Sequence, residues 1–121
     1  MKVGLIGVTG HTGYVLRGIG KDQDSRIVGI ATGSVGEKMA KRKDPQEATA
    51  GAPVYADYRK MLDELQPDIV AVACYFNDHG RITIEALQRG CHVFVEKPLA
   101  LTIDELERVK KVYAASRSEE R

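Results

Sequence analysis

The segment Gly7-Val8-Thr9-Gly10-His11-Thr12-Gly13 lies between an apolar stretch at residues 2–7 and a helical pattern that starts at its end. That helical pattern carries Tyr14, Val15, Leu16 and Ile19 at amphipathic spacing. Glycines at a strand-to-helix turn let the backbone turn tightly, and they leave room for a ligand beside it. The chain is therefore predicted to begin with a strand, a tight turn and a helix.

This glycine turn predicts a cradle for a pyrophosphate group, and so for a dinucleotide, because the free N–H groups of a helix start bind anions. The spacing is G-x-x-G-x-x-G, whereas G-x-G-x-x-G is the commoner form. A purely structural turn is the alternative, but the place of the turn after the first strand favours the cradle. We expect contacts from Gly7, Thr9, Gly10, His11, Thr12 and Gly13.

The rest of the chain alternates between strand and helix patterns. The apolar run at 69–73 predicts a strand that is covered on both faces at the centre of the sheet, and residues 93–95 predict a second buried strand. We expect further strands at 26–31 and 53–55. Helices are predicted around residues 37–43, after Asp57 as N-cap, from Asn77 or Asp78 as N-cap to Gly90, and after a Thr102/Glu105 capping box with an apolar stripe of Ile103, Leu106, Val109 and Tyr113.

Strands that alternate with helices through short loops require a parallel sheet with helices on both faces. The fold class is therefore α/β with a doubly wound parallel sheet, the Rossmann fold. A chain of 121 residues with 43% hydrophobic residues can bury one core and is too short for two ordinary domains. We expect one domain over residues 1–115 and a frayed tail over 116–121.

The composition excludes several kinds of partner. The 18 Lys and Arg residues nearly balance 17 Asp and Glu residues, so no broad positive field is available for nucleic acid. No apolar run approaches the roughly 20 residues of a membrane span, and the first residues read as a strand instead of a signal peptide. We expect a cytoplasmic protein with neither nucleic-acid nor membrane partners.

The cysteines and histidines do not form a predicted metal or disulfide site. Cys74 and Cys91 fall at opposite ends of neighbouring strands, on the order of 15 Å apart, too far for a disulfide. Both are expected to be free thiols, as in a reducing compartment. His11, His79 and His92 lack metal-ligand spacing, so no metal is predicted.

The end of the second strand bears on the choice of dinucleotide. A carboxylate about 20 residues past the glycines usually binds the adenosine ribose, but this position reads Ala31-Thr32-Gly33-Ser34. Ser34 can instead bind a 2′-phosphate, which Lys38, Arg42 or Lys43 could neutralise. These residues favour NADP over NAD, although the basic side chains could equally form a solvated face. We expect contacts from Thr32, Gly33, Ser34 and Lys38.

The third group is Glu96-Lys97-Pro98, directly after the strand at 93–95. Charged residues at the carboxyl end of a strand lie over the crevice where doubly wound folds bind ligands. Pro98 turns the chain away from the sheet. The alternative is a simple turn with a surface ion pair.

The stretch from Gly90 to Ala100, GCHVFVEKPLA, together with His79 at the head of a helix and the segment at 57–62, resembles the Gfo/Idh/MocA family of glucose-fructose oxidoreductase and inositol dehydrogenase. The resemblance covers nearly the whole chain. It implies that Lys97 is catalytic: it would contact the nicotinamide and the substrate hydroxyl and would assist proton movement. Further candidate coenzyme contacts at these loops are Cys74, Tyr75, Asn77, His79, Glu96 and Lys97, with His79 bonding locally and Cys74 in the core as alternatives.

The chain departs from the family pattern in three places. The glycine turn has one more residue between its first two glycines and resembles N-acetylglutamyl-phosphate reductase in that segment. The sequence Tyr75-Phe76-Asn77-Asp78 stands where family members commonly show Pro-Asn. The family also continues with another strand and an α/β domain for the substrate, so this chain is expected to be the coenzyme-binding part only.

The expected function is therefore the coenzyme-binding domain of an NAD(P)-dependent oxidoreductase, which transfers a hydride between a nicotinamide coenzyme and a sugar, cyclitol or similar polyol. The polyol would bind through the missing second domain. The isolated chain is expected to be inactive, and its unpaired sheet edge could support a homo-oligomer. The alternative is a non-catalytic module that senses or regulates through dinucleotide binding.

Overall fold

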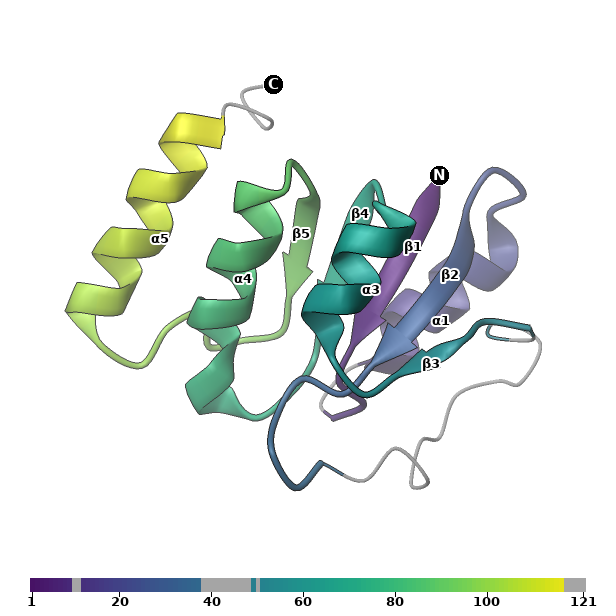
Figure 1. The fold of residues 1–121 in the computed structure, drawn as a ribbon, viewed down its shortest axis with the longest axis horizontal. Helices are drawn as coiled ribbons and strands as arrows, with labels where there is room; N and C mark the ends of the chain where they lie inside the picture. The colour runs from purple at the N-terminus through teal and green to yellow at the C-terminus, as the bar shows by residue number, and fades with distance from the viewer. Residues whose placement is uncertain (10–11, 38–48, 50, 117–121) are drawn as a thin grey trace.

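The computed structural model describes residues 1–9, 12–37, 49 and 51–116. The described residues form one five-stranded parallel sheet in the order β3-β2-β1-β4-β5 (Figure 1). This confirms the predicted doubly wound parallel sheet. Its strands are β1 (Lys2–Ile6), β2 (Arg26–Ala31), β3 (Val54–Tyr55), β4 (Ile69–Val72) and β5 (His92–Val95).

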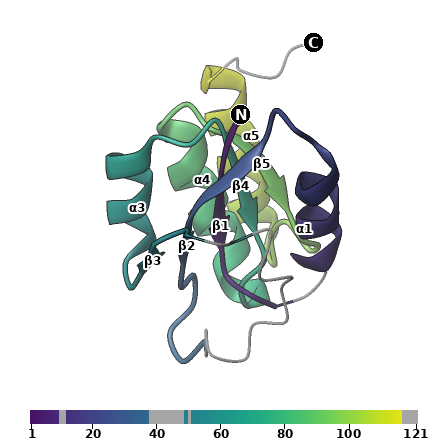
Figure 2. The same ribbon diagram turned by 90° about the vertical axis from the view of Figure 1, so that its right-hand side faces the viewer.

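The described helices lie on both faces of the sheet. Figure 2 shows α1 on one side and α3 and α4 on the other. A 3-10 turn, η2, leads into α4, and α5 packs against α4 at the β5 end of the molecule. The bounds are α1 (Thr12–Lys21), α3 (Tyr58–Leu65), η2 (Phe76–Asp78), α4 (His79–Gln88) and α5 (Ile103–Ser116).

Two apolar clusters fill the spaces between the sheet and its helices. Side chains from alternate positions of β1 enter both clusters, as expected for a strand that is covered on both faces. β1 is the middle strand and β4 is its neighbour, so the expectation that residues 69–73 form the centre is wrong by one strand. The cluster on the α1 side includes Val3, Leu5, Leu16, Ile30 and Ala71, and the cluster on the α3 and α4 side includes Ile6, Met61, Leu62, Val72 and Ile82.

Most predicted helix ends are confirmed. The Asp57 side chain accepts the N–H of Arg59 at 2.9 Å at the start of α3, and Thr102 Oγ1 accepts the N–H of Glu105 at 3.1 Å at the start of α5. Gly90 follows α4 with φ +80°, a conformation that glycine adopts readily.

Asp78 is the N-cap residue of α4, one of the two residues predicted for that position. Its side chain makes no capping hydrogen bond, because the preceding η2 turn already brings Asp78 into helical backbone geometry. Its carboxylate pairs instead with Arg81, at 2.8 Å.

The prediction that residues 93–95 form a fully buried strand is also wrong. β5 is an edge strand, and Phe94 is 51% exposed because no described helix covers it on the α1 side of the sheet. The final helix lies beside α4 instead, so the predicted apolar stripe of α5 is buried only in part: Val109 is in the core, whereas Ile103 and Tyr113 are exposed.

Three other expectations concern the whole chain. Cys74 and Cys91 are both buried and free, as predicted. No helix in the described ranges is long and apolar enough to cross a membrane. The α5 helix ends at Ser116, and residues 117–121, which include most of the predicted tail, lie outside the described residues.

Candidate functional site

The carboxyl ends of β1, β2, β4 and β5 meet at the lower edge of the sheet in Figure 1. In doubly wound folds this edge forms the ligand crevice. The loops at this edge cover residues 7–9, 32–37, 73–79 and 96–98. All three sequence groups singled out above therefore lie at one end of the sheet.

The glycine turn is tied to the end of β4. Gly7 has φ +89° and donates its N–H to Ala31 O at 2.8 Å, and a Cβ atom at this position would lie 2.5 Å from Ala73 O. Thr9 donates its N–H and its hydroxyl to Ala73 O, at 2.8 and 2.7 Å, and its hydroxyl also lies 2.8 Å from Cys74 O. The glycine at position 7 is thus required by packing against β4.

The first turn of α1 continues this arrangement. The buried Thr12 hydroxyl donates to the carbonyl of Thr9 at 2.8 Å. A Cβ atom on Gly13 would meet only the end of the flexible Arg17 side chain, at 3.1 Å. The fold therefore does not require glycine at position 13. Gly10 and His11 lie outside the described residues.

The carboxylate of Glu37 is bound at the glycine turn. This residue was not predicted from the sequence as part of the site. Glu37 accepts the N–H of Val8 with Oε2 at 2.9 Å, and its Oε1 accepts the N–H groups of Gly33 and Ser34 at 2.9 and 3.2 Å. The N–H of Val8 thus faces an anionic oxygen in this structure. The turn therefore fits an anionic ligand, as a dinucleotide pyrophosphate requires.

Glu37 was assigned to the start of a basic helix because the prediction looked for an acid at the end of the second strand. The signal that could have found it is the pair Gly33 and Gly36, which surround Ser34 and Val35 just before the acid. Gly36 has φ +84°, and the turn brings Glu37 back toward the strand ends.

The loops after β2 and β4 are joined through Ser34. Ser34 is 3% exposed, and its hydroxyl accepts the N–H of Tyr75 at 3.0 Å. Burial alone would raise the pKa of Asp78, but hydrogen bonds from Ser34 and Arg81 outweigh it and hold that pKa below its ordinary value. The Tyr75 hydroxyl lies 3.4 Å from Gly36 O. The Ser34 hydroxyl is therefore engaged inside the protein.

Of the described residues, the remaining candidates after β2 and β4 make fewer contacts than Ser34 and Tyr75 do. Thr32 is half-buried and donates its N–H to Tyr55 O at 3.3 Å, which extends the pairing of β2 with β3. Lys38 lies outside the described residues, as do Arg42 and Lys43. Asn77 is exposed on η2, on the outer side of the loop that Tyr75 begins.

His79 joins the loops after β4 and β5. It is fully buried; its Nδ1 lies 2.7 Å from Pro98 O, and its Nε2 lies 2.9 Å from Cys74 O. The buried Cys74 thiol has its pKa raised to about 11 by burial, which favours the core role that was left open for it. Of the two roles considered for His79, the contacts support local bonding.

Lys97 is a charged and exposed residue at the carboxyl edge of the sheet. The strand ladder ends where Glu96 donates its N–H to Val72 O at 2.9 Å, and the Lys97–Pro98 peptide bond is cis. The Lys97 side chain is exposed beyond that point. Because His79 holds the carbonyl of Pro98, the position of Lys97 is fixed relative to β4.

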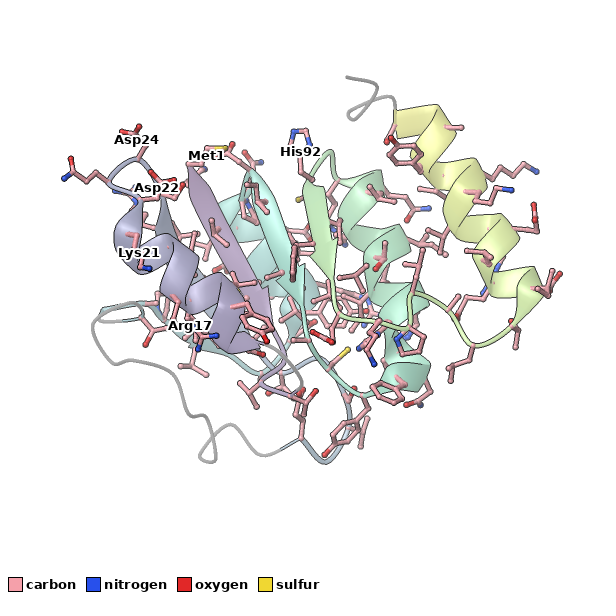
Figure 3. All side chains as sticks on the ribbon, turned by 180° about the vertical axis from the view of Figure 1, so that it is seen from behind. Met1, Arg17, Lys21, Asp22, Asp24 and His92 are labelled. Carbon is pink, nitrogen blue, oxygen red and sulfur yellow. The ribbon has the colours of Figure 1, made fainter. Side chains whose placement is uncertain are left out.

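The opposite end of the sheet is lined by Met1, Asp63, Asp68, Arg89 and His92, away from the three sequence groups. Figure 3 shows His92 and Met1 at the end where the strands begin, away from the glycine turn. In the described ranges no three His, Cys, Asp or Glu side chains are grouped so that they could hold a metal ion. His92 begins β5 and so lies at the end of the sheet away from the site.

A doubly wound parallel sheet with a glycine turn and a lysine at the same edge defines a dinucleotide-binding domain of the oxidoreductase class. Residues 1–118 match the Gfo/Idh/MocA family, described as an oxidoreductase family with an NAD-binding Rossmann fold. The chain belongs to this family. The resemblance predicted from the Glu96-Lys97-Pro98 segment is confirmed, and the coenzyme class is a nicotinamide dinucleotide.

Known proteins agree with this assignment. A protein from Thermotoga maritima that was assigned as an oxidoreductase has 36% identity and a TM-score of 0.86 over 98% of this chain and 36% of its own. The glycosyl hydrolase family 109 protein 1 of Akkermansia muciniphila is 36% identical over 69% of this chain and 18% of its own length. The D-glucoside 3-dehydrogenase of Escherichia coli is 41% identical over 46% of this chain and 16% of its own length. The chain thus matches about a third or less of each of these proteins.

Proposed function

We propose that this chain is the coenzyme domain of an oxidoreductase that transfers a hydride between a nicotinamide coenzyme and a hydroxyl-bearing carbon of a sugar, cyclitol or similar polyol. The observation that carries the proposal is the arrangement at one sheet edge: a turn that already binds an anionic oxygen lies at β1, and the exposed Lys97 lies at β5. The D-glucoside 3-dehydrogenase among the relatives supports a sugar-like substrate.

The roles of the chain's own residues follow from this arrangement. A bound nicotinamide coenzyme supplies the hydride acceptor or donor. The N–H groups at the start of α1 would hold the pyrophosphate oxygens, since those of Gly7, Val8 and Thr9 are bonded within the protein. Lys97 would donate a hydrogen bond to the substrate oxygen and move a proton at that atom. His79 would keep the Lys97 loop in place through Pro98.

The choice between NADP and NAD is a separate question from the class of coenzyme. The predicted preference for NADP depended on Ser34 and Lys38; the Ser34 hydroxyl is engaged with Tyr75 and Asp78, and Lys38 lies outside the described residues. NADP thus stays a prediction.

Two further expectations belong to the whole protein. A homo-oligomer is supported by the exposed edge strand β5, because such an edge can pair with a second chain. Sedimentation over a range of protein concentrations would test this, and a monomer at every concentration would contradict it. A cytoplasmic location stays a prediction.

Calorimetric titration of the chain with NAD and NADP tests the central proposal. We expect saturable binding of at least one coenzyme with one site per chain. The matched control is Glu107→Gln on the exposed surface of α5, which should bind the coenzyme as the wild type does. Absence of binding by both coenzymes to the folded chain would overturn the proposal.

A further inference from the structure

The carboxylate of Asp78 is bonded on one side to a helix and on the other side to a loop. It accepts a hydrogen bond from Arg81 of α4 at 2.8 Å, and it also accepts the hydroxyl proton of Ser34 from the loop after β2. The Asp78 side chain is 17% exposed. A fully exposed ion pair contributes little to stability, but a carboxylate that is largely buried loses much if its donors are removed.

Ser34 connects Asp78 to the backbone of the loop after β4. Ser34 is 3% exposed, and its oxygen accepts the N–H of Tyr75 at 3.0 Å. A hydroxyl has one proton and two lone pairs, so the bond to Asp78 uses the proton and leaves the lone pairs for Tyr75. The Tyr75 hydroxyl lies 3.4 Å from Gly36 O, which adds a second contact between the same two loops.

Arg81 anchors Asp78 to both helices on this face of the sheet. Its Nη2 donates to Asp78, and its Nη1 donates to the Tyr58 hydroxyl of α3 at 3.1 Å. Tyr58 in turn donates to the carboxylate of Glu85 in α4. Because the guanidinium group is a rigid planar fork, its two acceptors are fixed relative to each other. The orientation of Ser34 is therefore set from α3 and α4 through Asp78.

We propose that Asp78 is a positioning residue for coenzyme binding: through Ser34 it holds the loop after β2 against the loop after β4 in the arrangement that the coenzyme needs. The proposal rests on the proposed function. These two loops, residues 32–37 and 73–79, border the crevice where doubly wound folds bind their ligands. Loops that are already ordered bind a ligand without the entropic cost of ordering them.

Exchange of the Tyr75 amide proton, followed by NMR, tests the contact between the loops without coenzyme. We expect Asp78→Ala to speed this exchange by at least about tenfold, since the loss of a hydrogen bond to a charged group commonly costs that much. The matched control is Asp63→Ala. Asp63 also bonds an arginine of α4, Arg89, at 2.8 Å, but it lies at the opposite end of the sheet and should leave the Tyr75 exchange unchanged.

Titration with NAD and NADP tests the effect on binding. We expect Asp78→Ala to bind the wild type's tighter coenzyme about tenfold more weakly, because fixing one loosened residue costs about that much. Asp63→Ala should bind as the wild type does. Ser34→Ala should also weaken binding, and the double variant Ser34→Ala/Asp78→Ala should bind no more weakly than Ser34→Ala, since Asp78 acts through Ser34.

Arg81→Met replaces Asp78→Ala if circular dichroism shows that Asp78→Ala does not fold; it removes the same anchor and should give the same two results. Wild-type exchange of Tyr75 or wild-type affinity in the Asp78 variant would overturn the proposal and leave the proposed function standing, as would losses that multiply in the double variant. Absence of binding by both coenzymes to the wild-type chain would overturn the two together.

Discussion

Gly7 combines two separate constraints at a single residue. Its φ of +89° disfavours any L side chain, and its missing Cβ leaves room for the backbone of Ala73 and Cys74, at 2.5 and 2.6 Å. These backbone atoms directly follow β4 and are hydrogen-bonded to Ile6 and Thr9, so they cannot move aside cheaply. The identity of this residue is therefore fixed by the fold, before any ligand is considered.

We predict that Gly7→Ala lowers the free energy of unfolding by at least about 2 kcal/mol, because it adds a clash to an unfavourable backbone conformation. The control is Gly36→Ala, since Gly36 has φ +84° but nothing within 4 Å of a Cβ atom. That variant should lose only about 1 kcal/mol. Urea unfolding at neutral pH measures both changes. Equal losses would show that the contact with Ala73 does not matter.

The third glycine of the motif allows ligand binding to be separated from folding. Gly13 and Gly18 both lie in α1, and neither has a packing reason to be glycine: a Cβ atom at Gly13 meets only the Arg17 side chain, and one at Gly18 meets nothing. An alanine in a helix stabilises by roughly 0.5–1 kcal/mol relative to glycine. Both alanine variants should therefore be as stable as the wild type or more so.

We predict that Gly13→Ala nevertheless weakens coenzyme binding, by about tenfold, because its methyl group lies where the turn should approach a pyrophosphate. Gly18→Ala should bind as the wild type does. Titration of both variants, with melting temperatures as the stability readout, makes the comparison. If Gly13→Ala binds the coenzyme normally, the pyrophosphate does not approach α1 at this point.

At the scale of elements, α3 and α4 are joined by a polar cluster around Tyr58. The Tyr58 hydroxyl donates to the Glu85 carboxylate and accepts from Arg81 at 3.1 Å, while Arg59 pairs with Glu85 at 2.7 Å. Burial and the Glu85 carboxylate raise the pKa of Tyr58 well above its ordinary value. The folded protein thus holds this proton more tightly than the unfolded chain does.

The sign of the resulting pH dependence follows directly. The contribution of Tyr58 to stability is fully present below its unfolded pKa of about 10, and it is lost as the pH rises above that value, because the unfolded chain releases the proton first. We predict that Tyr58→Phe costs about 1 kcal/mol at pH 7 and flattens the fall in stability above pH 10. Unfolding by urea at several pH values measures this. The control is Glu107→Gln, at an exposed position of α5, which should leave the fall in stability above pH 10 unchanged.

Some features of the helices and strands could be predicted from the sequence, and others could not. The strand at 26–31 and the cap at Asp57 were predicted correctly because periodicity and capping are local properties of the sequence. The missing side-chain bond of the Asp78 cap and the exposure of Phe94 were not predicted, since the first depends on the backbone of η2 and the second on which helix covers β5. Tertiary neighbours decide such features.

In the candidate site, too, some features follow from local sequence patterns and others depend on tertiary contacts. Strand-end loops could be placed together from the alternation of elements alone, because parallel strands all end at one edge. The internal bonds of Ser34 and His79 could not be predicted, as they join loops from different parts of the chain. Glu37 was missed because its role depends on a turn that brings the side chain back to Val8.

At the scale of the whole molecule, coenzyme binding and catalysis are separable. In the proposed function the described loops would supply contacts for a dinucleotide, whereas Lys97 is exposed on the side where a substrate would have to be held. Positioning of reactants can account for roughly 7–11 kcal/mol of a reaction barrier. We therefore predict that the chain binds a nicotinamide coenzyme and shows no dehydrogenase activity above background with any polyol. Absorbance at the reduced coenzyme's band, with coenzyme and polyol in excess, checks this, and robust turnover would contradict it.

The bonds from Thr9 to Ala73 join residues 64 positions apart. A ribosome makes the chain from residue 1, so the glycine motif leaves the exit tunnel long before the strand that fixes its shape. Until β4 has emerged and paired with β1, Gly7 and Thr9 have no partner to hold them in their final geometry. A nascent chain that is paused before β4 has emerged therefore contains the complete glycine motif yet lacks the binding turn, and the emergence of residue 73 from the exit tunnel is the first point at which the coenzyme could stabilise the folding protein.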